Sequence, residues 1–186
     1  MGPCVSAGAL FVVRHAPVAF GGVCYGQSDV ATTLSPESAS EAVIGELERD
    51  RVRIDRVWTS PWRRKREPAA ALAAWVGVPL SVDARLAEIA FGEWEGRTWA
   101  ELEKDARFKT WMRTWQESGP PGGERLADFI ERVRSWRTDA LARVETALAW
   151  THAGVIRVLR ADSRGVGYEA IASESVESLK IERVEV

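Results

Sequence analysis

Short apolar runs alternate along the chain with longer segments in which apolar and polar residues are mixed. The runs have the length and composition of buried strands in a parallel sheet, and the mixed segments have the spacing of amphipathic helices. Strands are expected at 10–14, 54–59, 79–82 and 147–151, with a final one within 179–186. This alternation predicts a three-layer α/β/α fold with a mostly parallel central sheet.

Capping residues mark where the helices begin and end. Ser35-Pro36 places an N-cap residue before a proline at the first helical position, and Ser60-Pro61 repeats this pair. Thr98 and Glu101 have the spacing of a capping box. Apolar residues at helical spacing predict a long helix over 124–145, and short helices are expected after the strand at 147–151, to about residue 173.

The chain has two histidines, and each follows an apolar run. His15 closes the run at 10–14, and His152 closes the run at 147–151. In open α/β sheets, ligands bind at the carboxyl edge of the strands. Either histidine alone is compatible with a buried core residue. Both together, with Arg14 beside the first, predict a site that contains two imidazoles.

Composition limits the classes of function. The 186 residues suit one domain, 1–186, and are 46% hydrophobic and 28% charged. A net charge of −2 offers no basic field for nucleic acid or for a membrane surface. Cys4 and Cys24 show no spacing typical of a zinc site or a disulfide scaffold. No apolar run reaches the length of a membrane span, and residues 1–9 lack the pattern of a signal peptide. A cytoplasmic protein is therefore expected.

The residues near the two histidines suggest phosphate chemistry. Arg14 precedes His15, and Arg64 follows another strand end near the start of a helix. Arginine's planar fork and a helix N-terminus both suit a phosphate group. A solvated basic turn is the alternative for Arg64 and its basic neighbours. Three carboxylates in the loop at 86–96 are candidate proton donors for a leaving oxygen: Glu88, Glu93 and Glu95.

Five segments of the chain, taken in order from residue 10 to about 160, resemble signatures of the histidine phosphatase superfamily, which includes the cofactor-dependent phosphoglycerate mutases. The segments resemble the RHG, SPxxR, acidic-loop, PGGE and THGGVIR patterns, and they are Val13–Ala16, Ser60–Arg64, Leu86–Gly96, Pro120–Glu124 and Thr151–Arg157. Val23–Asp29 resembles the CYGxxD stretch of the alpha-ribazole phosphatase-like group. The chain departs from the family pattern at Ala16 and Ala153, where glycine is usual, and at Pro68, where threonine is usual.

The resemblance implies a phosphoglycerate mutase-like fold and a metal-independent phosphomonoesterase that needs no cofactor. In that reading His15 becomes a phosphohistidine, while Arg14, Arg64 and His152 hold the phosphoryl oxygens. Glu88 donates a proton to the leaving group. Gln27, Ser28 and Ala153 line the phosphate pocket. The implied partner is a small phosphorylated metabolite, with alpha-ribazole phosphate as one candidate.

Two other functions remain open from the sequence. One is a phosphoglycerate mutase, although Ile89, Ala90 and Phe91 stand where the mutases differ. The other is a protein that binds phosphorylated ligands without turnover. A homodimer through the edge strand within 179–186 is also open.

The nine tryptophans divide into two groups. Trp58, Trp75, Trp136 and Trp150 fall on predicted strands or helix faces and are expected in the core. Trp94, Trp99, Trp111 and Trp115 either form an aromatic wall for the substrate or pack their own segment.

Overall fold

A five-stranded sheet forms the centre of the molecule, in a computed structural model that describes residues 9–142 and 146–184. The strand order is β3-β2-β4-β1-β5, with β5 antiparallel to β1 and the other pairs parallel. The strands are β1 (Leu10–Arg14), β2 (Arg56–Thr59), β3 (Leu80–Val82), β4 (Ala147–Thr151) and β5 (Ile181–Val184). All five predicted strands are present.

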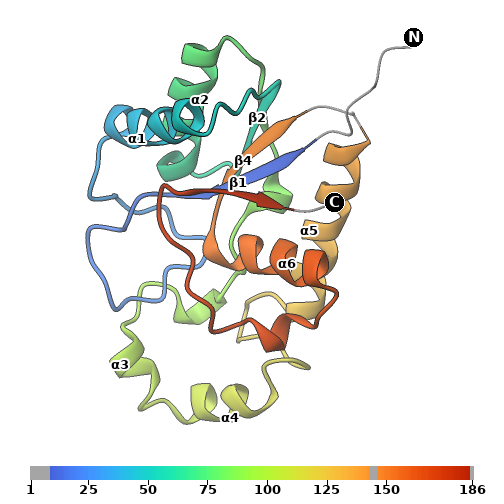
Figure 1. Ribbon diagram of the computed structural model, residues 1–186. Coiled ribbons are helices and arrows are strands. Elements are labelled where there is room, and N and C mark those ends of the chain that lie inside the picture. Colours follow the sequence, from blue (N-terminus) through green and yellow to red (C-terminus); the bar gives the residue numbers. More distant parts are fainter. Residues whose placement is uncertain (1–8, 143–145, 185–186) are drawn as a thin grey trace.

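Helices cover both faces of this sheet (Figure 1). One layer holds α1 (Pro36–Arg49) and α2 (Arg63–Val76), and the other holds α5 (Leu126–Leu141) and α6 (Ala153–Arg164). The short helices α3 (Trp99–Leu102) and α4 (Ala106–Thr114) lie apart from both layers, at the bottom of the view. Three 3₁₀ helices span Ala84–Leu86, Gly92–Trp94 and Tyr168–Ala170. The predicted three-layer fold is confirmed.

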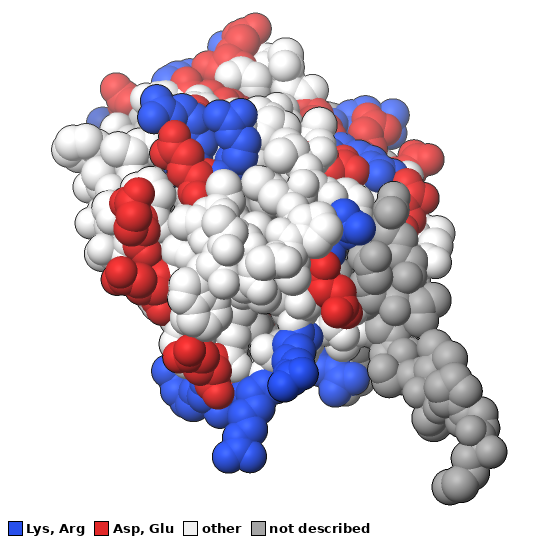
Figure 2. Space-filling model, turned by 90° about the horizontal axis from the view of Figure 1, so that it is seen from above, with Lys and Arg blue, Asp and Glu red and all other residues white. Residues whose placement is uncertain are grey.

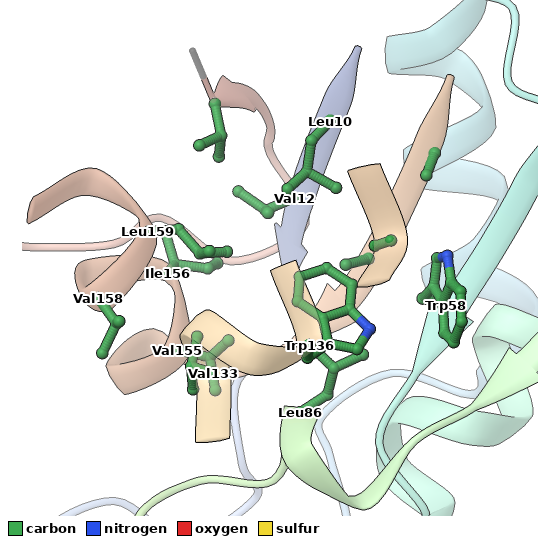
Figure 3. Close-up of a cluster of buried hydrophobic side chains, with 14 of the residues drawn as sticks. Leu10, Val12, Trp58, Leu86, Val133, Trp136, Val155, Ile156, Val158 and Leu159 are labelled. Carbon is green, nitrogen blue, oxygen red and sulfur yellow. The ribbon is translucent and has the colours of Figure 1, made fainter. Parts of the chain in front are cut away.

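Alternate side chains of the inner strands enter two separate cores, as the pleat of a strand requires. Leu10 and Val12 of β1 pack with α5 and α6, around the buried Trp136 (Figure 3). Val13 of β1 and Trp150 of β4 point to the other face and pack with α1 and α2. Because β1 and β4 are buried on both faces, packing fixes the positions of the residues that follow them, His15 and His152.

The two Ser-Pro pairs have different structural roles. Ser35 caps α1 as predicted, because its hydroxyl accepts from the Ser38 N–H at 3.1 Å. The prediction that Ser60 caps the next helix is wrong. The N-cap of α2 is Trp62, whose side chain makes no capping bond, and Arg64 is the second residue of the helix.

The capping box at Thr98 is present, but α3 lasts one turn before a break leads into α4. The long helix predicted over 124–145 is α5, which the structure shows from Leu126 to Leu141. Val144, at the end of that predicted range, lies outside the described residues, as does Cys4.

The tryptophans only partly follow the sequence expectation. Trp58, Trp136 and Trp150 are buried, whereas Trp75 is 57% exposed, so the prediction that it belongs to the core is wrong. Trp75 lies in the last turn of α2, where the next residue, Val76, packs against the core instead. Adjacent helix residues point in different directions, and Trp75 therefore faces solvent.

The segment after the acidic loop has its own aromatic cluster. Trp94 is fully buried, with its ring centroid 5.1 Å from that of Trp111 and 5.2 Å from that of Phe108. Trp99 packs against Phe91 at 5.9 Å between centroids. These tryptophans therefore pack their own segment, which was one of the two readings of the sequence.

The face seen in Figure 2 has an uncharged centre, and acidic side chains lie beside the basic ones where these gather. Basic side chains gather along the lower edge of this view (Figure 2). Among the described helices, none combines the length and apolar character needed to cross a bilayer.

Candidate active site

The two histidines lie side by side just beyond the carboxyl ends of adjacent parallel strands. Arg14 of β1 stands opposite Thr151 of β4, and the His15 N–H donates to the Thr151 carbonyl at 3.2 Å. The next residue on each strand is a histidine. Their ring centroids are 5.4 Å apart at an interplanar angle of 78°, and both side chains are buried. The sequence prediction that two imidazoles share one edge is confirmed.

A backbone contact fixes the proton position on His15. The Nδ1 atom of His15 lies 2.6 Å from the Ala16 carbonyl oxygen. A carbonyl oxygen can only accept, so Nδ1 carries the proton and Nε2 keeps its lone pair. The imidazole therefore has an unprotonated nitrogen available for nucleophilic attack.

Burial keeps both rings neutral. Burial, followed by the nearby charge of Lys65, lowers the pKa of His15 to about 3, although the bond to Ala16 acts in the opposite direction. Burial also lowers the pKa of His152 well below its usual value, and Lys65 again adds to the effect. A neutral imidazole is the form that can act as a nucleophile.

Arg14 and Arg64 are anchored through backbone carbonyls. Arg14 Nη1 donates to the Val176 carbonyl at 2.7 Å. Arg64 donates from Nη2 to the Gly26 carbonyl at 3.3 Å and from Nη1 to the Ser28 carbonyl. The Nε atoms of both arginines are buried and have no hydrogen-bond partner within residues 9–142 and 146–184. Buried N–H donors normally have an acceptor, so each guanidinium has an unmet requirement for one.

The start of α2 is held by a residue far away in sequence. Asp29 accepts from the Arg63 N–H at 2.9 Å and from the Arg64 N–H at 3.4 Å. A carboxylate at this position satisfies orphan N–H groups and favours the helix dipole. Ser60 is thereby free of the capping role, and its hydroxyl lies 3.4 Å from His152 Nε2.

Glu88 lies at the N-terminus of α6. Its Oε2 accepts from the Gly154 N–H at 3.1 Å, and its Oε1 accepts from the Ile89 N–H at 3.1 Å. A Cβ atom added to Gly154 would lie 2.1 Å from Glu88 Oε1. Glycine at 154 therefore allows this carboxylate to lie directly against the helix start, two residues along the chain from His152.

The other two candidate carboxylates have separate roles. Glu95 accepts from the Gln27 N–H at 3.0 Å and from the Ser28 hydroxyl at 2.8 Å. It therefore holds the loop whose carbonyls bind Arg64. Glu93 is exposed and pairs with Arg107 at 3.0 Å. Of the three, Glu88 is the one that contacts the helix following His152.

Gln27, Ser28 and Ala153 are also placed by the structure. Gln27 Nε2 donates to the Glu88 carbonyl at 3.0 Å, which ties the loop at 15–34 to the acidic loop. The Ser28 hydroxyl is occupied by Glu95. Ala153 is the first residue of α6 and packs at the edge of the α5/α6 core. The Ala16 side chain is buried in the α1/α2 core, whereas that of Ala153 is only partly buried.

Two residues near the site were not identified from the sequence. Arg132 of α5 donates to the carbonyls of Ala87 and Glu88, at 2.8 and 3.0 Å, and forms an ion pair with Glu124 at 2.6 Å. It thereby supports the segment that carries Glu88. Lys65 follows Arg64 in α2 and is fully buried. No local sequence pattern indicates that Arg132 contacts the acidic loop. Lys65 lies in a run of four basic residues, so the sequence does not indicate that its side chain is buried.

Trp115 is placed differently from the other tryptophans of its segment. Its ring packs against Tyr168 at 6.4 Å between centroids, and Tyr168 in turn packs against Phe129. Burial, followed by the charge of Glu88, raises the pKa of the Tyr168 hydroxyl to about 12. The aromatic cluster of Trp115, Tyr168 and Phe129 therefore lies close enough to Glu88 for the carboxylate charge to act on Tyr168. No group of three or more metal-binding side chains occurs in the described part of the chain.

The chain is similar in sequence to proteins that are named as phosphatases. A protein of Hydrogenobacter thermophilus provisionally named phosphoserine phosphatase 2 is 31% identical over 166 residues, or 86% of this chain and 80% of that protein. The adenosylcobalamin/alpha-ribazole phosphatase of Salmonella typhimurium is 33% identical over 110 residues, which are 57% of this chain and 54% of the relative.

Solved structures show the same fold. The alpha-ribazole phosphatase from Shigella flexneri superposes with a TM-score of 0.84 at 22% identity, covering 96% of this chain and 90% of that one. The sequence pattern of the histidine phosphatase superfamily (branch 1) matches residues 10–186. The resemblance found in the sequence is thus confirmed, and the chain belongs to the histidine phosphatase superfamily, branch 1.

Proposed function

We propose that this protein is a metal-independent phosphomonoesterase that acts on a small phosphorylated metabolite through a phosphohistidine intermediate. One observation carries the proposal: a neutral imidazole with a free nitrogen lies among buried arginine N–H donors that have no acceptor. A phosphoryl group supplies both an electrophilic phosphorus for the imidazole and anionic oxygens for the donors.

In the first step, His15 Nε2 attacks phosphorus while the bond from phosphorus to the ester oxygen breaks. The electron pair of that bond moves to the leaving oxygen, and Glu88 in its protonated form supplies the proton. Arg14, Arg64 and His152 donate to the equatorial oxygens, where the transition state spreads its charge. The products are an alcohol and a phosphohistidine.

In the second step, water attacks the phosphohistidine. Glu88, now a carboxylate, accepts a proton from the water as the oxygen–phosphorus bond forms and the nitrogen–phosphorus bond breaks. Inorganic phosphate leaves, and His15 returns to its neutral form. Both oxygens of Glu88 accept backbone N–H bonds, which fix its position, and each oxygen keeps a second lone pair for the transferred proton.

A phosphatase is favoured over the two other functions. The relatives are named as phosphatases of phosphoserine and of alpha-ribazole or adenosylcobalamin phosphates, so alpha-ribazole phosphate stays a candidate substrate. The mutase reading gains no support from Ile89, which stands beside the proton donor and carries no charge for a second anionic group. A binding protein without turnover would not need Glu88 to be held against α6.

The test measures phosphate release from a panel of phosphomonoesters and then traps the intermediate. Brief incubation with a ³²P-labelled substrate should leave an acid-labile label on His15. His15→Ala should lower turnover by at least about 10⁴-fold, since the nucleophile and its supporting groups act as a unit. His152→Ala should lower turnover but keep any label on His15. Label on His152, or activity that survives His15→Ala, would refute the mechanism.

Two further properties are proposed with this function. A cytoplasmic location suits Cys24, which is a buried free thiol. A homodimer would use β5, which lies at one edge of the sheet. Sedimentation velocity decides between monomer and dimer, and a concentration-independent monomer would remove the second property.

A further inference from the structure

Lys65 is the most unusual side chain near the site. It lies in the first turn of α2, and its side chain has no exposed surface. Its Nζ atom has no hydrogen-bond partner among the residues that the structure describes, and it lies 5.9 Å from the centroid of the Trp62 ring. A buried ammonium group without an acceptor is strongly unfavourable. A role in stability therefore does not explain this lysine.

Lys65 belongs to the same cluster as the reacting groups. The charged or titratable groups that act on it are Arg64 of the same helix, Asp29 of the loop at 15–34 and Glu88 of the acidic loop. Lys65 in turn acts on His15 and His152, at the ends of β1 and β4. Among the cations that act on His15, Lys65 has the largest effect, ahead of Arg64 and Arg14.

The arginines differ from this lysine in one respect. Arg14 and Arg64 are each anchored by at least one backbone carbonyl, whereas all three donors of the Lys65 ammonium lack such an acceptor. An anion held between His15 and Arg64 would supply acceptor oxygens where Lys65 lacks them. Of these three basic side chains, Lys65 is therefore the one whose hydrogen-bonding donors a bound anion would satisfy most completely.

We propose that Lys65 is an additional phosphate-binding residue, whose amine takes up a proton from solvent and donates to an oxygen of the phosphoryl group when a phosphate dianion binds. This inference rests on the proposed function and adds a residue to it. Burial, followed by the charge of Arg64, lowers the pKa of Lys65 to about 6. Without a bound anion the amine is therefore mostly neutral above that pH, and a bound dianion raises its pKa again.

Inorganic phosphate is the probe for the test. Calorimetric titrations at about pH 8, in buffers of different ionisation enthalpy, report both affinity and the number of protons taken up. The wild-type protein should take up protons as phosphate binds. Lys65→Met keeps the length of the side chain without the charge, and it should bind phosphate about 10- to 100-fold more weakly with a smaller proton uptake. Lys65→Gln, a second variant in case Met does not fold, should show the same changes.

Arg66→Met is the matched control, because Arg66 is the next residue of α2 and is exposed. It should leave phosphate affinity and proton uptake unchanged. Lys65→Met should also raise the unfolding temperature, because it removes a buried amine that has no hydrogen-bond partner in the described chain. A purely structural lysine would show the opposite change in stability.

The outcomes separate the two proposals. Phosphate affinity and proton uptake equal to wild type in Lys65→Met would overturn the role of Lys65 and leave the phosphatase intact. A wild-type protein that neither binds phosphate nor hydrolyses any phosphomonoester would overturn the proposed function itself.

Discussion

The two sides of the site differ in how completely their polar groups are satisfied. On the cationic side, buried donor nitrogens of Arg14, Arg64 and Lys65 have no acceptor within the described chain. On the carboxylate side, Glu88 and Glu95 accept N–H or O–H donors at both oxygens. The protein itself therefore satisfies the carboxylate side, whereas the donors of the cationic side need the acceptor oxygens of a bound anion.

This difference assigns separate tasks to the two sides. Unsatisfied donors create a strong preference for an anionic ligand, because that ligand removes the cost of burying them. A carboxylate fixed by two backbone N–H groups does not need to be reoriented when the substrate arrives. The cationic side is thus adapted to hold the phosphoryl group, and the carboxylate side to place one proton at a defined position.

The largest expected effect is that of Glu88→Gln on hydrolysis rates, and it tests whether proton donation and phosphoryl binding are separate. Glu88→Gln leaves the cationic side unchanged, so phosphoryl transfer from an aryl phosphate to His15 should continue. Esters with alkoxide leaving groups need a proton and should slow by about 10²–10⁴-fold more than aryl esters. Steady-state rates on matched aryl and alkyl phosphates measure this ratio.

Glu93→Gln is the control for this experiment, because Glu93 belongs to the same loop but is exposed and paired with Arg107. It should leave the ratio of the two rates unchanged. Equal slowing of aryl and alkyl esters by Glu88→Gln would mean that Glu88 positions the phosphoryl group instead of donating a proton.

A second variant moves the carboxylate without removing it. The methyl group of Gly154→Ala would lie 2.1 Å from Glu88 Oε1, so Glu88 must shift. A displacement of about 1 Å in a reacting group can slow the reaction by up to about 10²-fold, and here alkyl esters should again be affected more. Gly45→Ala makes the same change inside α1, where the added Cβ meets no atom within 4 Å, and it should leave both rates unchanged. Rates on alkyl esters unaffected by Gly154→Ala would show that the contact with α6 does not matter for proton transfer.

The smallest expected effect, taken per pH unit and per histidine, concerns stability at acid pH. The folded-state pKa of His15 is about 3, and that of His152 is also lowered, both mainly by burial. The unfolded chain therefore binds more protons than the folded protein between about pH 6.5 and pH 3. Stability should fall as the pH is lowered through this range, by at most about 1.4 kcal/mol per pH unit for each histidine.

Urea unfolding at a series of pH values measures this slope. His15→Asn removes one of the two groups and should reduce the slope over the same range. A slope that is identical in wild type and His15→Asn would mean that His15 is protonated in the folded protein, contrary to the neutral nucleophile inferred above.

The sequence predicts the parts of this molecule that depend on local pattern. Buried strands, the Ser35 cap and the positions of His15 and His152 follow from the order of apolar and polar residues. The wrong cap at Ser60 has a different origin, because Asp29 caps α2 from a distant loop. No local pattern contains that contact, just as none distinguishes the buried Lys65 from the exposed Arg66.

Ala16, which stands where the family usually has glycine, is a second case in which only the folded structure shows the contacts. Position 16 contributes its carbonyl oxygen to His15, and any residue supplies a carbonyl. The methyl group of Ala16 lies in the α1/α2 core, away from the bond that its backbone makes. The sequence identifies the departure from the family pattern, but only the fold shows where the added methyl group goes.

The strand order also determines when the site can form. β1, which ends beside the nucleophile, is one of the first elements of the chain, yet its sheet neighbours β4 and β5 are the last two strands. Contacts between such distant segments form slowly because a long loop must close first. During synthesis, β1 therefore has no neighbour in the sheet until β4 and β5 have been made. A chain that ends before β4 contains His15 but lacks His152 and the strands that hold His15 in place. Phosphatase activity should therefore appear only once β4 and β5 are present.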